Sequence, residues 1–203
     1  HGNWRWFFDY GTGDLGNDGV HRIDYCRIVM GLEEMPQAIC CSGGIFLFDD
    51  DQQWPDTMII NYEFPGKVVQ YEMRLWSNPK LFGVSEGAAV YGENGWLLLT
   101  NRGGKAYDAA GKIVKQGESN GDVTQQAHTR NFLDAVHSRN RDSLNQEIYS
   151  GHVSSTMCHA GNISWRTGKK LRARASEIAL VFRDPPHMIF PRMEGRRGNA
   201  LII

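Results

Sequence analysis

The densest group of residues able to do chemistry lies between positions 17 and 24. It contains Asn17, Asp18, His21 and Asp24. If a helix begins near Asn17, then Asn17, His21 and Asp24 follow one another at spacings of four and three and share one helix face. Histidine is the side chain that titrates nearest neutral pH without help from its surroundings. This face therefore predicts that His21 exchanges a proton with a ligand hydroxyl.

A structural interpretation of the same residues stays open. Asn17 or Asp18 would cap the start of the helix, because short polar side chains there accept hydrogen bonds from free backbone N–H groups. His21 would then be a packed, hydrogen-bonded residue without a chemical role.

A second polar stripe lies nearer the C-terminus, where His152, Ser155, His159 and Asn162 recur at helical spacing. Seven residues separate the two histidines, which is about 10 Å along a helix axis and too far for them to share one metal ion unaided. HExxH, paired-cysteine and EF-hand motifs are absent from the sequence. We predict no metal site and interpret the stripe as an interface or core feature.

Glycines precede the first polar group, in the segment GTGDLG at residues 11–16. The spacing superficially matches the dinucleotide-binding fingerprint, but no apolar strand comes before it. We therefore predict a loop here, whose glycines permit positive φ and close backbone approach, and at most weak binding of NAD(H) by this chain.

The remaining patterns predict helices at both ends and strands between them. Helices are expected over residues 19–31, over 125–140 after an N-cap at Thr124, and from about 145 to 166 before Gly168. Apolar alternation and turn residues predict strands over 37–48, 57–64, 69–76, 88–91, 95–100, 105–107 and 112–115. Because no βαβ alternation occurs, the expected fold class is α+β, with a large, mainly antiparallel open sheet and helices packed on one face.

Composition excludes several functional classes. The 203 residues carry 22 Lys and Arg against 23 Asp and Glu, for a net charge of −1, so we expect no nucleic-acid partner. No apolar run approaches the length of a membrane span, and the chain reads as soluble. The four cysteines are predicted to be buried free thiols. We expect a cytoplasmic protein, with periplasmic export as the alternative if a signal precedes His1.

Several long motifs point to one family. They are WRWFFDYGTGDLGNDGVHRID at 4–24, DDQQWPDT at 50–57, YGENGWL at 91–97 and the segment from His128 to Leu171. Together they resemble the C-terminal domain of the glucose-fructose oxidoreductase, inositol dehydrogenase and rhizopine-catabolism (Gfo/Idh/MocA) family, and more closely its bacterial branch. The resemblance covers residues 1–171, and residues 172–203 are expected to be a divergent tail.

The resemblance implies a substrate-binding and oligomerisation domain that works beside an N-terminal Rossmann domain carrying NAD or NADP. That Rossmann domain is absent from these residues, so the chain alone is not expected to turn over substrate. In the family motif a catalytic His follows an Asp by four residues, which carries over to His21 and places Asn17 where Asp is commoner. Asn17 and Asp18 would position substrate hydroxyls, while Trp6 and Tyr10 would form a wall of the cleft.

Two functions follow as hypotheses. The first is the substrate half of an NAD(P)-dependent oxidoreductase acting on a sugar, polyol or related hydroxyl compound. The second is a non-catalytic binding or assembly module that keeps the same fold. For either, self-association through the open sheet is expected, with Tyr71, Met73, Leu75 and Trp76 supplying the apolar surface.

Overall fold

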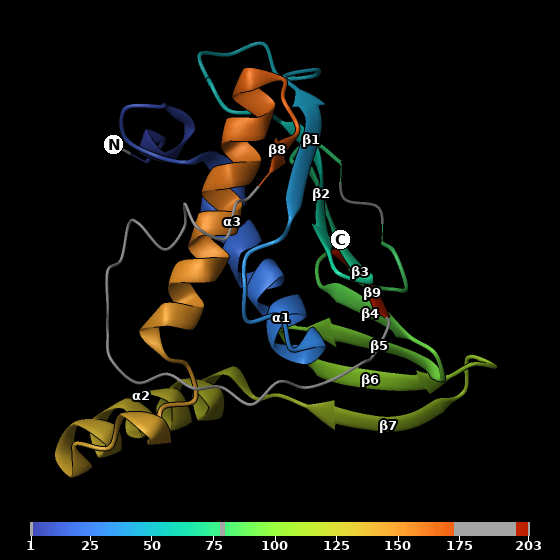
Figure 1. The fold of residues 1–203 in the computed structure, drawn as a ribbon, viewed down its shortest axis with the longest axis vertical. Coiled ribbons are helices and arrows are strands. Elements are labelled where there is room, and N and C mark those ends of the chain that lie inside the picture. The colour runs from blue at the N-terminus through green and yellow to red at the C-terminus, as the bar shows by residue number, and fades with distance from the viewer. Residues whose placement is uncertain (1, 78–79, 173–197, 203) are drawn as a thin grey trace.

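The structure, a computed structural model, describes residues 2–77, 80–172 and 198–202. It confirms the predicted α+β class. Helices and a large twisted sheet form two layers, and both main helices lie on the same side of the sheet (Figure 1).

The sheet has nine strands in the order β7-β6-β5-β4-β9-β3-β2-β1-β8. Every pairing between described strands is antiparallel except that of β3 with β9. Two antiparallel halves of four strands thus meet at β9. The strands are β1 (Ala38–Gly44), β2 (Thr57–Phe64), β3 (Lys67–Arg74), β4 (Ala88–Gly92), β5 (Gly95–Thr100), β6 (Gly103–Asp108), β7 (Ile113–Glu118), β8 (Leu171–Arg172) and β9 (Gly198–Ile202).

Alternate side chains of the strands point to the inner face of this sheet, which the helices cover. Met58, Ile60 and Tyr62 of β2 are buried, and they lie opposite Met73, Tyr71 and Val69 of β3. Gly66 adopts the positive φ of +69° that the tight turn between β2 and β3 requires. The hairpin predicted around Pro65 is therefore confirmed.

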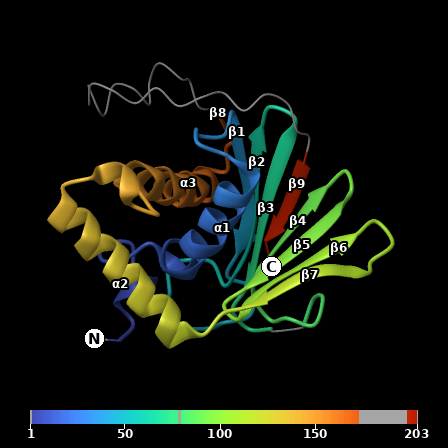
Figure 2. The same cartoon turned by 90° about the horizontal axis from the view of Figure 1, so that it is seen from below.

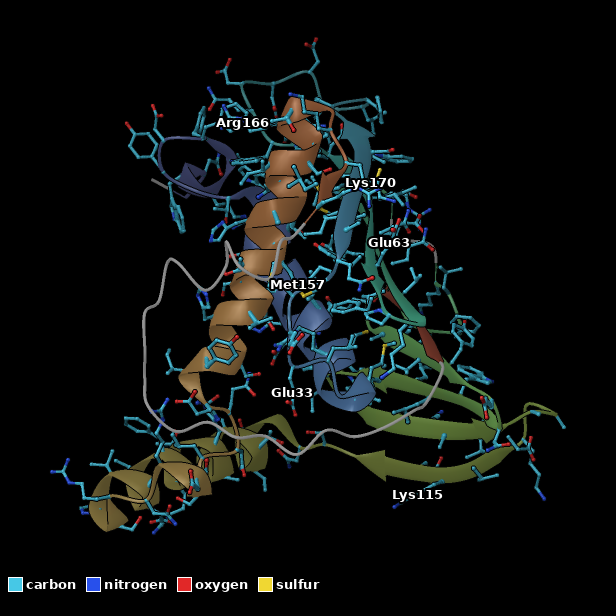
Figure 3. All side chains as sticks on the ribbon, in the orientation of Figure 1. Glu33, Glu63, Lys115, Met157, Arg166 and Lys170 are labelled. Carbon is cyan, nitrogen blue, oxygen red and sulfur yellow. The ribbon has the colours of Figure 1, made fainter. Side chains whose placement is uncertain are left out.

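Two helices cover that face. Helix α1 (Val20–Met30) and helix α3 (Ile148–Thr167) lie side by side over the sheet, with α3 against β1 and α1 nearer β3, β4 and β9 (Figures 1 and 2). Met157 of α3 is fully buried in this layer (Figure 3). Gly31 and Gly168 end α1 and α3 in the left-handed conformation, as predicted.

Helix α2 (Gly121–Ser138) extends away from the other two helices (Figure 2). Its N-cap is Asn120, whose side chain accepts hydrogen bonds from the N–H groups of Asp122 and Val123, so the prediction of a cap at Thr124 is wrong. Ala135 is its one buried residue, while Phe132, Leu133 and Val136 are exposed.

The apolar surface predicted for self-association needs correction. Tyr71 and Met73 are buried under the helices and Leu75 packs against the same core, because these positions belong to the inner face of the sheet. Trp76 is exposed, as are Ile59 and Val68 on the outer face. Any pairing through the sheet must use outer-face residues instead.

Other predictions hold only in part. All four cysteines are free, but Cys26 and Cys158 are buried whereas Cys40 and Cys41 are half-buried. The sheet also includes residues 198–202 from the expected tail, as strand β9 between β3 and β4; most of that tail lies outside the described residues. In the described part of the chain, no helix has the length and apolarity needed to cross a bilayer.

Residues 45–48 leave the predicted strand because a buried carboxylate binds their backbone. Oδ2 of the fully buried Asp56 accepts hydrogen bonds from the N–H groups of Phe46, Leu47 and Phe48 at 2.9, 2.8 and 3.1 Å, and the Thr57 hydroxyl donates to Oδ1. Burial raises the pKa of Asp56, but these hydrogen bonds lower it by more, so the pKa lies below its usual range.

We predict that Asp56→Asn lowers the free energy of unfolding at pH 7 by about 2 kcal/mol, because charge-assisted hydrogen bonds are lost. A depressed folded-state pKa gives stability that is present above the unfolded pKa of about 4 and is lost as pH falls through the folded value. The difference from wild type should therefore shrink in acid. Urea unfolding at pH 7 and at about pH 3 measures this. The exposed Asp9→Asn is the matched control, and an equal loss in both variants would contradict the assignment.

Candidate functional site

The polar group at residues 17–24 lies on a helix that starts with an irregular turn. Residues 13 and 14 are already helical, and η2 (Leu15–Gly19) is a π-helical turn that continues directly into α1. The predicted loop is therefore helical from residue 13 onward. Single π-helical turns inside α-helices occur often at functional sites.

Close packing explains the glycine at position 19. A Cβ there would lie 2.9 Å from the hydroxyl oxygen of Tyr71 on β3. Glycine therefore lets the π-helical turn approach the sheet, and the following residues of α1 are held against the core.

Asn17, Asp18 and His21 are exposed on this helix. No side chain caps either η2 or α1, and the helix begins before Asn17. Among the described residues, none hydrogen-bonds to the imidazole of His21. The capping interpretation is thus wrong, and three polar side chains remain facing solvent at the start of α1.

Asp24 belongs to a different environment. Its Oδ1 accepts a 2.6 Å hydrogen bond from the Ser154 hydroxyl of α3, and that hydroxyl accepts a 2.7 Å bond from the buried guanidinium of Arg27. Gln146 donates to both Asp24 oxygens at 3.1 and 3.2 Å. Asp24 therefore joins α1 to α3 rather than acting with His21.

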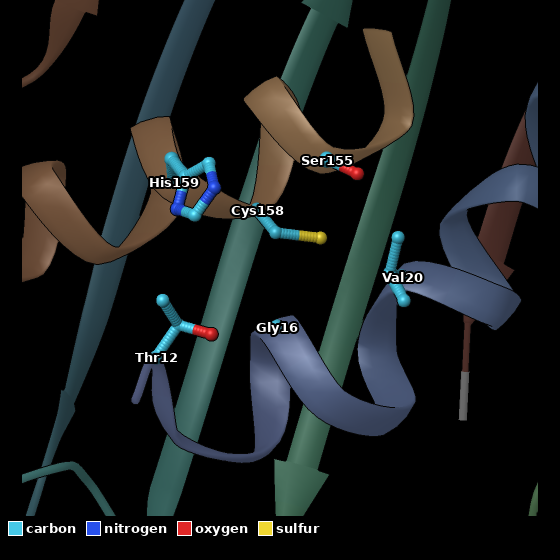
Figure 4. Close-up of a pocket in the computed structure, with 6 residues that line it drawn as sticks. All are labelled: Thr12, Gly16, Val20, Ser155, Cys158 and His159. Atoms are coloured by element: carbon cyan, nitrogen blue, oxygen red, sulfur yellow. The ribbon is translucent and has the colours of Figure 1, made fainter. Parts of the chain in front are cut away.

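The second polar stripe meets the first helix at a cavity of about 100 Å³. Ser155, Cys158 and His159 of α3 line one side, and Thr12, Gly16 and Val20 line the other (Figure 4). Ser155 and His159 are exposed at this cavity. Their spacing of four residues was visible in the sequence, but the element they face was not.

The other two residues of the stripe have separate surroundings. Asn162 is buried and its side-chain amide donates a 2.8 Å hydrogen bond to the carbonyl of Thr12. His152 lies against the ring of Tyr149 and near the hydroxyl of Thr156. The core interpretation of the stripe thus fits the buried Asn162, whereas for the exposed Ser155 and His159 the interface interpretation stays a prediction.

Ionisation around the cavity favours hydrogen bonding over nucleophilic chemistry. Burial raises the pKa of the Cys158 thiol to about 12, so the thiol is protonated and unreactive at neutral pH. Burial also raises the pKa of Asp14, the neighbouring Asp18 raises it further, and Arg5 lowers it. Two carboxyl groups, those of Asp14 and Asp18, therefore lie close together on the turn that follows Thr12, and their proximity disfavours the charged form of Asp14.

Trp6 and Tyr10, the residues predicted to wall the cleft, lie outside this cavity. Trp6 is half-buried in η1 (Trp4–Trp6), beneath the guanidinium of Arg5 at 4.8 Å, and Tyr10 is 73% exposed. Neither lines the cavity between η2 and α3. Their role in a cleft stays a prediction.

The described surroundings of residues 11–16 do not form the dinucleotide-binding fingerprint. A pyrophosphate site needs a parallel strand leading into the glycine-rich helix start, and here the short helix η1 precedes residues 11–16 instead. Within the described ranges, no group of three or more His, Cys, Asp or Glu side chains is placed to hold a metal ion.

Comparison with solved structures finds oxidoreductases. The WlbA dehydrogenase from Bordetella pertussis, in complex with NADH and UDP-GlcNAcA, matches with a TM-score of 0.54 at 14% identity, over 85% of this chain and 48% of that one. An oxidoreductase from Agrobacterium radiobacter, in complex with NAD+, L-tartaric acid and magnesium, matches with a TM-score of 0.60 at 13% identity, over 79% and 49%. A proposed NADPH-dependent oxidoreductase from Desulfitobacterium hafniense matches with a TM-score of 0.63 at 15% identity, over 87% of this chain and 52% of that one.

The chain has the fold of one part of these oxidoreductases. It spans about half of their length. No protein-family model matches the sequence, and no curated protein matches it either.

The contrast between Asp24 and Asp18 gives a stability test. Arg27 Nη1 also lies 3.5 Å from Asp24 Oδ1. We predict that Asp24→Ala lowers the free energy of unfolding by about 3 kcal/mol, because the buried Arg27 loses this counter-charge. Asp18→Asn, an exposed change on the same helix, should alter stability by less than about 0.5 kcal/mol. Urea unfolding of the two variants checks this, and equal effects would show that Asp24 does not hold α1 to α3.

Proposed function

We propose that this chain is the substrate-binding and oligomerisation half of an NAD(P)-dependent oxidoreductase of the Gfo/Idh/MocA family, acting on a sugar, polyol or related hydroxyl compound. The observation that carries this proposal is the exposed set Asn17, Asp18 and His21 on a π-helical turn, in a fold shared with oxidoreductases. Exposed polar groups with no partner among the described residues are available to a ligand.

His21 would accept the proton of the substrate hydroxyl. Its imidazole is solvent-accessible, and α1 holds its backbone on a rigid helix anchored by the core. Asn17 lies one helical turn earlier and would donate or accept hydrogen bonds without adding charge. Asp18 would accept hydrogen bonds from further hydroxyls, and Trp6 and Tyr10 would wall the cleft.

NAD or NADP would supply the hydride acceptor from outside the described residues, since their geometry does not fit a dinucleotide. The sugar nucleotide in the WlbA complex supports a hydroxyl-rich substrate here. The free cysteines support a reducing, cytoplasmic location.

A homo-oligomer is part of the proposal. Ile59 and Val68 on the outer face of the sheet are exposed, with Trp76 beside Thr57, whose hydroxyl accepts a 2.8 Å hydrogen bond from the indole N–H. These apolar side chains on an open sheet face suit the contact with a second copy.

His21→Asn tests the function in a longer form of the protein that also contains an NAD(P)-binding domain. We predict that the rate of polyol oxidation falls by about 100-fold or more, the usual scale for loss of an acid/base group, with cofactor affinity nearly unchanged. Steady-state kinetics with separate titration of NAD(P)H measures both quantities.

The matched control is His128→Asn, at an exposed position of α2. It should leave the rate unchanged, and both variants must be compared as folded protein at equal concentration. Full activity of a well-folded His21→Asn enzyme would remove His21 from the chemistry and favour a non-catalytic binding module.

A further inference from the structure

The cavity between η2 and α3 contains hydrogen-bonding groups that nothing in the proposed chemistry uses. Two hydroxyls, those of Thr12 and Ser155, and the imidazole of His159 line it. None of these three groups hydrogen-bonds to a described residue through its side chain. Their hydrogen-bonding capacity is open to a ligand.

The cavity depends on the glycine at position 16. A Cβ on Gly16 would lie 1.9 Å from the hydroxyl oxygen of Thr12. Any larger residue would therefore displace the Thr12 side chain from the cavity wall. Asn162 fixes the same wall from α3, through its hydrogen bond to the Thr12 carbonyl.

Asn162 contacts the backbone of Thr12 but is not one of the residues that line the cavity. The residue is 4% exposed, and its Oδ1 is buried without a hydrogen bond from the described residues. It lies on the same stripe of α3 as Ser155 and His159. Buried acceptors of this kind are usually satisfied by a water molecule or a ligand donor.

The cavity adjoins the residues of the proposed function. Gly16 and Val20 line it, and Asn17 and His21 follow each of them by one residue and are exposed. A subsite here requires that a substrate bound at Asn17 and His21 extend around the helix to the face of Gly16 and Val20.

The size and charge of the cavity limit which group of the substrate can bind there. A volume of about 100 Å³ is enough for a small group such as a hydroxymethyl. No Lys or Arg lines the cavity, and Asp14 and Asp18 lie on the turn beside it. A neutral group is favoured over a carboxylate or phosphate.

We propose that this cavity is a hydroxyl-binding subsite, in which His159, Ser155 and Thr12 bind a neutral hydroxymethyl or hydroxyl group of the substrate. The subsite rests on the proposed function for the position of the rest of the substrate. It makes His159 a binding residue that favours a neutral group over a carboxylate at this one position of the substrate.

Histidine side-chain NMR on the isotope-labelled chain tests the subsite directly. D-Sorbitol is titrated to about 100 mM, a range that covers weak fragment-like binding, and L-tartrate serves as the anionic probe. We expect a saturable shift of the His159 resonances with D-sorbitol and a smaller one with L-tartrate. A stronger response to L-tartrate would overturn the neutral specificity.

Two variants sharpen the result. Ser155→Ala removes one hydrogen-bonding group at an exposed position and should weaken D-sorbitol binding by about 3- to 10-fold. Ser155→Leu should fill the cavity and abolish the His159 shift. The control His137→Ala, on the surface of α2, should change neither D-sorbitol binding nor the His159 shift.

Failure of the subsite is distinct from failure of the proposed function. Shifts at His21 without shifts at His159 would overturn the subsite and leave the role of His21 standing. The absence of any His159 shift, or an unchanged shift in Ser155→Leu, would also overturn it. The role of His21 is decided separately, by the rate of the His21→Asn enzyme.

Discussion

Close approach of three elements is the constraint on which the rest of the structure depends. Glycine occupies two of these close contacts, that of the π-helical turn η2 with β3 and that of α3 with β2. A Cβ on Gly19 would lie 2.9 Å from the Tyr71 hydroxyl, and one on Gly161 would lie 2.8 Å from the side chain of Ile60. Without these side chains the elements pack directly, and the polar network of Asp24, Arg27 and Ser154 then fixes α1 against α3. The exposed positions of Asn17 and His21 follow from this anchoring.

Local patterns predicted much of the fold. The alternation of Met58, Ile60 and Tyr62 identified a half-buried strand, and Gly31 and Gly168 marked the helix ends correctly. What could not be predicted was non-local. Strand β9 joins two halves of the sheet through pairing with β3 and β4, and no local signal specifies such partners. The inward orientation of Tyr71 and Met73 depends equally on which face the helices cover.

The residue types of the candidate site could be predicted from the sequence, but which of those residues lie together could not. Spacing alone placed Asn17, His21 and Asp24 on one face of a regular helix, but the chain starts its helix earlier, with a π-helical turn, and Asp24 binds to α3. Spacing also identified Ser155 and His159 without indicating that Thr12 and Gly16 lie opposite them. Such a pairing arises from packing of segments about 140 residues apart, which a periodicity within one helix does not report.

We propose that these residues form a substrate half without a dinucleotide site. Isothermal titration of the 203-residue chain with NADH tests this most directly. The glycine-rich start of the helix has no parallel strand behind it, so we predict no saturable binding up to about 1 mM NADH. Binding with a Kd of about 10 µM or tighter would contradict the account, since it would place the cofactor site within this chain.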